Sequence, residues 1–240
     1  MRNINSTHTA RSILFTILII AAGSGLAFGQ FESTSRMLST TIMSTTDSLF
    51  RAQTGVIQQR KSMAIAAGVY PAGTAPSTAA PPPQQIPRQF PITATDFRPA
   101  SGPIVPNQLA DSATGVDPQT REQMRKLFQQ ALTSFEAGAR KNNLANAFAF
   151  ITAIALKVRT GQEPTNAQAD QLITYFNNVV GGSPAFRTYD ARQLQTLYES
   201  LVITGNIIAL LDAQANNPQL QAQAKEMSRV VLKQFLEIDA

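Results

Sequence analysis

The chain has no cysteine and no tryptophan, and its only histidine is His8. Without cysteine it forms no disulfide bonds, so a folded domain must be held together by packing. Beyond residue 8 the sequence cannot supply a Ser-His-Asp triad, a Cys-His pair, a histidine-bound zinc or iron, or a haem histidine. Phosphate-binding motifs of the types G-x-x-x-x-G-K-[ST] and G-x-G-x-x-G are also missing. We therefore expect no cofactor and no metal site, and an enzyme is the less favoured class.

Charge is scarce as well. Charged residues make up 15% of the 240 residues, below the roughly 25% usual for globular domains. Amides take their place, with 22 Gln and 12 Asn against 6 Lys. Residues 1–29 contain two of the 20 Lys and Arg and none of the 15 Asp and Glu, so the rest of the chain carries a net charge of only +3. A small basic cluster of Arg121, Arg125 and Lys126 is typical of a solvated helix face, and we expect no nucleic-acid partner.

The first 29 residues have the pattern of a secretory signal. A basic start precedes an apolar run over residues 12–22, and the small residues Ala27 and Gly29 stand three and one positions before Gln30. The run is too short to cross a bilayer, which takes about 20 apolar residues. We predict cleavage after Gly29, export to the periplasm or out of the cell, and no stable membrane span in the mature chain. A signal retained as an anchor is the alternative.

Residues 30–94 are predicted to be a low-complexity, disordered region. It is rich in Ser and Thr at first, and residues 71–106 hold ten of the fourteen prolines. Proline fixes φ and removes a main-chain donor, which favours an extended linker over packed structure. The alternative for this stretch is a proline-rich docking peptide that binds an aromatic groove.

Residues 95–240 are predicted to form an all-α domain, a compact bundle of about five helices preceded by an extended arm over residues 95–116. The four prolines after the linker each stand at or just before the start of a helical pattern, where a missing N–H costs nothing. No alternation typical of strands competes with the helical periodicity. The helices are expected over residues 118–141, 144–159, 165–180 and 190–214, and from residue 218 onward.

The stretch from Asp190 to Gln214 is expected to be the central helix. Its apolar residues occupy more than one face, which requires neighbours on several sides. Gly205 in its middle would cost about 1 kcal/mol relative to Ala in an exposed helix. We therefore expect Gly205 to mark a close crossing with the Ala-rich helix over residues 144–159.

Two carboxylates are the only weak candidates for catalysis. Glu199 and Ser200 superficially resemble the Glu-Ser pair of lytic transglycosylases, enzymes that use a glutamate as general acid. The other motifs of that family are missing. Glu136 is the second candidate, and it stands four residues before Arg140, with which it can pair on one helix face. The simpler interpretation places Glu199 on the more solvated edge of its helix, so no catalytic residue is predicted.

Three short segments carry a family pattern. They are the Phe97-Arg98-Pro99 entry, the Asn146-Ala147-Phe148-Ala149-Phe150 start of the second helix, and the Leu197-Tyr198-Glu199 turn of the fourth. With the sequence around them, over roughly residues 90–238, they resemble an uncharacterised family of exported bacterial proteins, a domain of unknown function. The resemblance implies a signal peptide, a low-complexity region and a C-terminal helical domain, and it brings no activity.

The same resemblance implies that the arm belongs to the domain, with Phe97, Ile104, Val105 and Leu109 as its anchors. The marker residues are predicted to be packing positions rather than site residues. They are Phe97, Phe148, Phe150, Leu197 and Tyr198, together with Gly205.

Three functions remain open. The leading hypothesis is an exported, non-enzymatic helical module that binds a protein of the cell envelope. The second is a carboxylate-dependent hydrolase of cell-wall glycan. The third is a carrier that holds an apolar ligand between its helices, in a cavity of the usual size for ligand pockets. Its lining would come from Phe128, Phe135, Phe148, Phe150 and Phe176.

Overall fold

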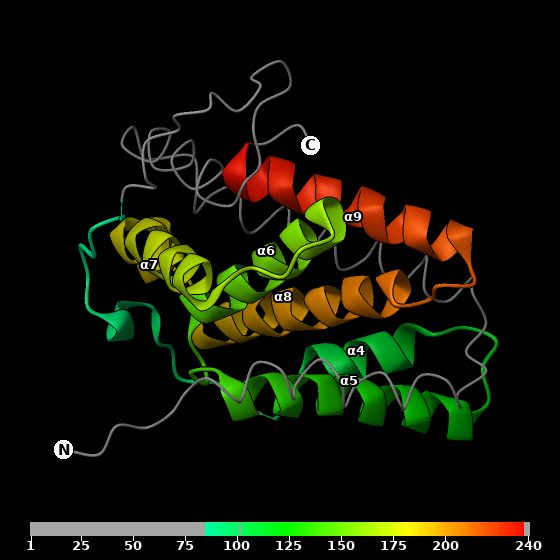
Figure 1. Ribbon diagram of the computed structural model, residues 1–240. Helices are drawn as coiled ribbons and strands as arrows, with labels where there is room; N and C mark the ends of the chain where they lie inside the picture. Colours follow the sequence, from blue (N-terminus) through cyan, green and yellow to red (C-terminus); the bar gives the residue numbers. More distant parts are fainter. Residues whose placement is uncertain (1–84, 101, 238–240) are drawn as a thin grey trace.

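The computed structural model describes residues 85–100 and 102–237 (Figure 1). The predicted signal peptide and nearly all of the predicted low-complexity region lie outside the described residues. Within them the fold is all-α, as predicted, and the only strand-like feature is an isolated bridge between Asp96 and Asn143. The elements are η2 (Ile92–Thr95), α4 (Val105–Ser112), α5 (Pro118–Gly138), α6 (Leu144–Thr160), α7 (Asn166–Gly182), η3 (Ala185–Arg187), α8 (Ala191–Asp212) and α9 (Pro218–Leu236).

Local capping signals explain where five of these helices begin. Asp117, Asn143 and Asn217 are the N-caps of α5, α6 and α9, and each side chain accepts the N–H of the residue three positions on. Helices α7 and α8 begin in capping boxes headed by Thr165 and Asp190. The sequence therefore determines these starts without help from tertiary contacts.

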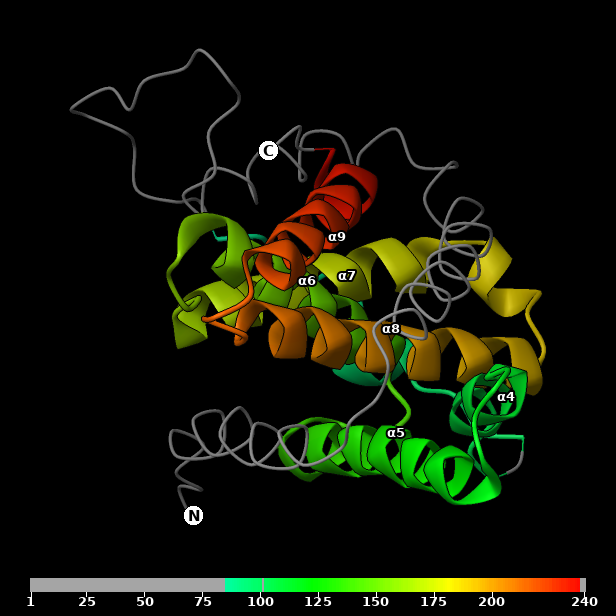
Figure 2. The same cartoon turned by 90° about the vertical axis from the view of Figure 1, so that its right-hand side faces the viewer.

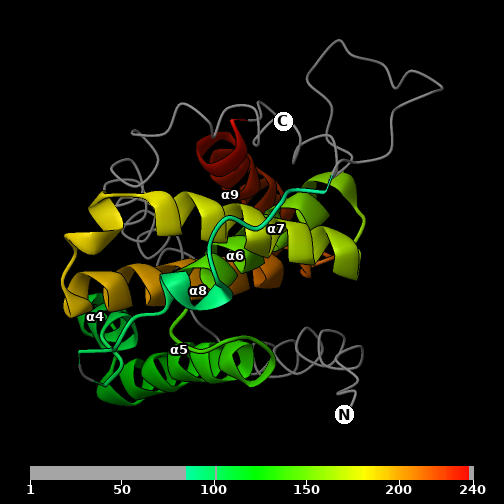
Figure 3. The same cartoon turned by 90° about the vertical axis from the view of Figure 1, so that its left-hand side faces the viewer.

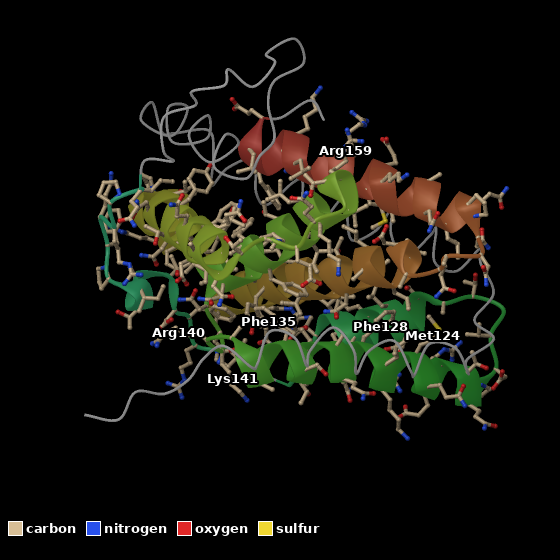
Figure 4. The ribbon with its side chains drawn as sticks, in the orientation of Figure 1. Met124, Phe128, Phe135, Arg140, Lys141 and Arg159 are labelled. Atoms are coloured by element: carbon tan, nitrogen blue, oxygen red, sulfur yellow. The ribbon has the colours of Figure 1, made fainter. Side chains whose placement is uncertain are left out.

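Helices α6 and α8 form the centre of the bundle. Helix α6 packs against α7, α8 and α9, while α8 packs against α6, α9 and the α4–α5 pair. Figures 1 and 2 show three layers, with α9 on one side, α6, α7 and α8 in the middle, and α4 with α5 on the other side. From α5, Met124, Phe128 and Phe135 point toward the rest of the bundle (Figure 4). The predicted central helix is thus one of two central helices.

Helix α8 is the only helix of the described part of the chain that is long and apolar enough, by length and composition, to cross a bilayer. The mean hydropathy of its most apolar window is 1.3, but 83% of that window is buried inside the protein. Other helices of the same chain therefore cover the apolar surface of α8, as expected for the core helix of a bundle.

Gly205 lies at a close crossing of α8 with α6. A Cβ atom at this position would stand 2.7 Å from Cε1 of Phe150 and 3.4 Å from Cα of Ile151. The predicted crossing with the helix over residues 144–159 is confirmed. The neighbours are an aromatic ring and the main chain of α6 rather than its alanines.

Four of the five phenylalanines considered as the lining of a ligand cavity, all except Phe128, pack against other aromatic rings. The ring centroid of Phe148 lies 5.3 Å from that of Phe176 and 5.1 Å from that of Phe235. Those of Phe135 and Phe150 are 4.9 Å apart. Stacked and edge-on rings at these separations are typical of a filled core.

Residues 105–112 form helix α4, which corrects the expectation of an extended arm over residues 95–116. The predicted anchors are right, because Ile104, Val105 and Leu109 are at most 6% exposed. The extended conformation predicted for this stretch was wrong, because residues 105–112 are helical. Pro106 stands in the first turn of α4, a position that proline favours, but the proline-rich composition around it masked the helical pattern.

Residues 86–100 and 102–104, to which the word arm refers from here on in place of residues 95–116, run across α7 and on to α8 before α4 begins (Figure 3). The turn η2 packs on α7, where Phe90 and Ala94 lie against Gly181. Ile86 also packs against the core. Contact with the bundle therefore begins before residue 95, in a stretch whose composition suggested a linker.

Candidate functional site

The arm is held by side-chain amides that project from the bundle. On α7, Asn178 is 3% exposed and binds the arm in both directions. Its Nδ2 donates to the carbonyl of Pro87 at 2.9 Å, and its Oδ1 accepts the N–H of Gln89 at 2.8 Å. These two main-chain groups flank Arg88 on one edge of the arm. The amide therefore pairs with the arm much as a neighbouring strand would.

Asn177, one residue earlier on α7, is fully buried and also binds the arm. Its Nδ2 donates to the carbonyls of Phe90 at 2.9 Å and Pro91 at 3.1 Å. Its Oδ1 accepts the hydroxyl of Thr95 at 3.1 Å. Two polar residues in the middle of a largely buried helix are thereby satisfied by the arm.

Asn143, the N-cap of α6, is the third amide. It is fully buried, and its Nδ2 donates to the carbonyl of Ile92 at 2.9 Å and to Oδ1 of Asp96 at 2.8 Å. Arg140 binds the same carboxylate, and its Nε donates a hydrogen bond to Oδ1 of Asp96 at 2.7 Å. The Arg140 guanidinium lowers the pKa of Asp96, and the hydrogen bond from Asn143 acts in the same direction. Figure 4 shows Arg140 beside this part of the arm.

Gln195 on α8 is the fourth amide and is 4% exposed. Its Oε1 accepts the N–H of Ala100 at 2.9 Å, and its Nε2 donates to the carbonyl of Gly102 at 3.0 Å. The same Nε2 also donates to Oε1 of Glu199 at 2.7 Å. Gln195 therefore joins the last part of the arm to a buried carboxylate.

Glu199, one of the two catalytic candidates, caps helix α4. Its Oε2 accepts the N–H groups of Ile104 at 2.9 Å and Val105 at 2.7 Å. No side chain of α4 caps this end. A carboxylate at a helix N-terminus satisfies free N–H groups and is favoured by the helix dipole. Burial nevertheless raises the pKa of Glu199, and the charge of Glu136 adds to that rise.

Glu136, the other candidate, lies near Tyr198 and the loop after α5. The Tyr198 hydroxyl donates to Oε1 of Glu136 at 3.3 Å, and Nζ of Lys141 lies 3.3 Å from Oε2. Arg140, expected as the partner of Glu136 on the same helix face, pairs with Asp96 of the arm instead. Burial is the main reason that the pKa of Tyr198 is raised, and the negative charge of Glu136 raises this pKa further. The hydroxyl therefore stays protonated and acts as a hydrogen-bond donor.

The six marker residues are packing positions in the structure. Phe97 is half-buried, and its ring meets the Tyr198 ring edge-on at 5.4 Å between centroids. Phe148 and Leu197 are at most 1% exposed, and Phe150 packs over Gly205. The aromatic pair of Phe97 and Tyr198 joins the arm to the interior of the bundle.

The sequence did not single out the residues that hold the arm. We define the amide face as Asn143, Asn177, Asn178 and Gln195. A usable signal was the adjacent asparagine pair inside an otherwise apolar helical stretch, because buried amides require hydrogen-bond partners. The amide-rich composition pointed in the same direction without identifying positions.

The amide face matches the chemistry of a proline-containing chain. It donates to five main-chain carbonyls of the arm and accepts only two main-chain N–H groups. Proline supplies a carbonyl but no N–H, so a segment with several prolines presents more acceptors than donors. The arm contains Pro87, Pro91, Pro99 and Pro103. A donor-rich face therefore binds a donor-poor segment.

Two members of the basic cluster at the start of α5, Arg125 and Lys126, pair with acidic groups, while Arg121 donates to the carbonyl of Ala113. Arg125 contacts Glu122 and lies 2.8 Å from Asp111 of α4, and Lys126 lies 4.0 Å from Glu122. The pair between Arg125 and Asp111 joins α4 to α5, whereas the pairs with Glu122 lie within α5. Among the described residues, no three His, Cys, Asp or Glu side chains are grouped so that they could hold a metal ion.

The fold and its amide face define an all-α helical domain that binds an extended segment of its own chain. The chain belongs to DUF6683, a family of unknown function, whose model matches residues 8–240. The match extends further toward the N-terminus than the resemblance over residues 90–238. Comparisons with curated proteins and with solved structures gave no match.

Proposed function

We propose that this protein is an exported, non-enzymatic interaction module that binds extended polypeptide in the cell envelope. The amide face is the observation that carries the proposal. Its four side chains are between 0% and 4% exposed, and all four direct hydrogen bonds at the main chain of the arm, which is extended except at the turn η2. Buried amides that bind a peptide main chain supply affinity with little dependence on the bound sequence.

The positions of the two carboxylates support binding over glycan hydrolysis. A general acid must come within hydrogen-bond reach of the leaving oxygen of its substrate. Glu199 is 4% exposed and already accepts three hydrogen bonds from the protein. Glu136 is engaged by Tyr198 and Lys141. Both groups have structural partners, which favours a scaffold role for each.

Export is supported by the sequence pattern of residues 1–29. The test is the mass of the N-terminal peptide of the protein isolated from its own organism. The expected product begins at Gln30 and is found outside the cytoplasm. A product that retains Met1 and stays in the cytoplasm would remove the envelope from the proposal.

Binding is tested by capture from the envelope fraction of the same organism, with the mature chain as bait. Three baits are compared: wild type, Asn178→Ala on the amide face, and Asn166→Ala at an exposed position of the same helix. We expect one or a few partners that Asn178→Ala loses and Asn166→Ala keeps.

Two results would contradict the proposed function. One is a wild-type bait that enriches nothing over an empty support. The other is release of soluble glycan fragments from purified cell wall by the wild type but not by Glu136→Gln. That second result would establish the hydrolase instead.

A further inference from the structure

The arm contacts the bundle in two ways that differ in selectivity. The amide face binds main-chain atoms, which any extended segment of the same length would offer. Three consecutive residues add side-chain contacts. Thr95 donates to Asn177, Asp96 pairs with Arg140, and the Phe97 ring packs on Tyr198. The binding surface is therefore selective for the sequence of this arm, whichever copy of the chain provides it.

A short link joins these contacts to α4. Its described residues are all exposed, namely Arg98, Pro99, Ala100, Gly102 and Pro103. A side chain added at Gly102 would meet nothing within 4 Å. Gln195 supplies two hydrogen bonds from the bundle to the link. Beyond the link, Glu199 accepts the N–H groups of Ile104 and Val105 and so anchors the start of α4. The arm can therefore swing away while α4 remains in place, as a hinge of a few residues allows.

We propose that residues 86–97 of one copy dock on the amide face of a second copy, in a reciprocal exchange that joins two chains. The exchanged dimer remakes each contact of the closed monomer, and its two docking sites are equivalent by twofold symmetry. This inference rests on the proposed function and names its partner, a second copy of the chain. The attached arm competes at an effective concentration in the millimolar range, so exchange increases with protein concentration.

Engineered cysteines test the exchange directly, since the chain has none of its own. Cβ of Ala94 lies 3.4 Å from the position that a Cβ of residue 181 would occupy. That is close to the Cβ separation of about 3.5–4.5 Å found in disulfides. Full-length chains carrying only Ala94→Cys are mixed with chains carrying only Gly181→Cys, oxidised, and analysed by non-reducing electrophoresis and peptide mass spectrometry.

The expected product is a disulfide between Cys-substituted positions 94 and 181 of two different chains. Its yield should rise with protein concentration, because the attached arm of each chain competes at an effective concentration in the millimolar range. The yield should also exceed, by about tenfold, the yield obtained when Asn166→Cys replaces Gly181→Cys. Position 166 is exposed on the same helix and reports random collisions. The double variant Ala94→Cys/Gly181→Cys checks the geometry, because it should close an internal disulfide when dilute.

Two outcomes would overturn the exchange. The first is an internal disulfide in the double variant together with a mixed product no greater than that of the collision control. The second is a double variant that forms no internal disulfide, because the arm would then not lie against α7. Neither outcome affects the envelope capture experiment, since another protein can bind this module without any exchange.

Discussion

At the scale of single residues, Glu199 shows why one side chain can be required at a position without being catalytic. Three donors converge on it: the N–H groups of Ile104 and Val105, and the amide of Gln195. A carboxylate accepts at both oxygens, whereas glutamine would turn its own NH2 group toward one of these donors. The hydrogen bonds offset part of the cost of burying a charge, and burial remains the larger effect on the pKa of Glu199.

The pH dependence of stability tests this role. Burial raises the pKa of Glu199, so the folded protein holds the proton more tightly than the unfolded chain. The contribution of Glu199 to the free energy of unfolding is therefore full below its ordinary pKa and declines as pH rises through the raised value. The difference in unfolding free energy between wild type and Glu199→Gln should fall with rising pH, by at most about 1.4 kcal/mol per unit.

The measurement is urea unfolding of both proteins from just above the ordinary pKa of glutamate to neutral pH. Asp96 does not interfere there, since its pKa is lowered and its contribution is lost only in more acidic solution. A difference that grows with rising pH would mean that Glu199 is stabilised in its charged form, contrary to this assignment.

Asn178 allows a second test at the same scale. Asn178→Ala leaves the carbonyl of Pro87 and the N–H of Gln89 without their partner, which should cost about 1–2 kcal/mol of unfolding free energy. Hydrogen exchange at Gln89 should accelerate in the same variant. Asn166→Ala is the matched control, because it changes an exposed residue of the same helix and should have little effect. Equal destabilisation by both variants would show that the arm contributes nothing through Asn178.

At the scale of elements, local signals predicted five of the six α-helices in the described part of the chain, because their caps lie within three residues of the groups they satisfy. Helix α4 differs in this respect. Its N-terminus is satisfied by Glu199, which lies 94 and 95 residues along the chain from Val105 and Ile104. A sequence window around residues 105–112 contains the apolar anchors but not the group that caps them.

The crossing of α6 and α8 at Gly205 is testable by substitution. Gly205→Leu would place its Cβ 2.7 Å from Cε1 of Phe150, and its remaining atoms would force the two helices apart. We expect a loss of about 1–3 kcal/mol in unfolding free energy, typical of overpacking, and a lower melting temperature. Gly102→Leu is the control, since nothing lies within 4 Å of its added Cβ. An unchanged melting curve for Gly205→Leu would refute the close crossing.

At the scale of the whole molecule, the amide face depends on contacts between residues far apart in the sequence. The hydrogen bonds of Asn177, Asn178 and Gln195 to the arm join residues 82 to 95 positions apart. Periodicity identifies which helix faces are apolar, but it cannot show that buried amides on α7 and α8 meet the main chain of a proline-rich segment. The bundle was therefore predictable from the sequence, while the amide face required the three-dimensional arrangement.

The layered arrangement also predicts which part of the molecule opens first. Helix α5 packs chiefly on α4 and α8, at one side of the bundle, whereas α6 is enclosed by α7, α8 and α9. Native-state hydrogen exchange at increasing denaturant should show the amides of α4 and α5 opening at a lower free energy than those of α6. Glu199→Gln should lower the opening free energy of α4 further and leave α6 nearly unchanged, because its carboxylate binds the start of α4. If α5 and α6 opened together at one free energy in both proteins, the α4–α5 pair would not be a separable layer, and the bundle would unfold as a single cooperative unit.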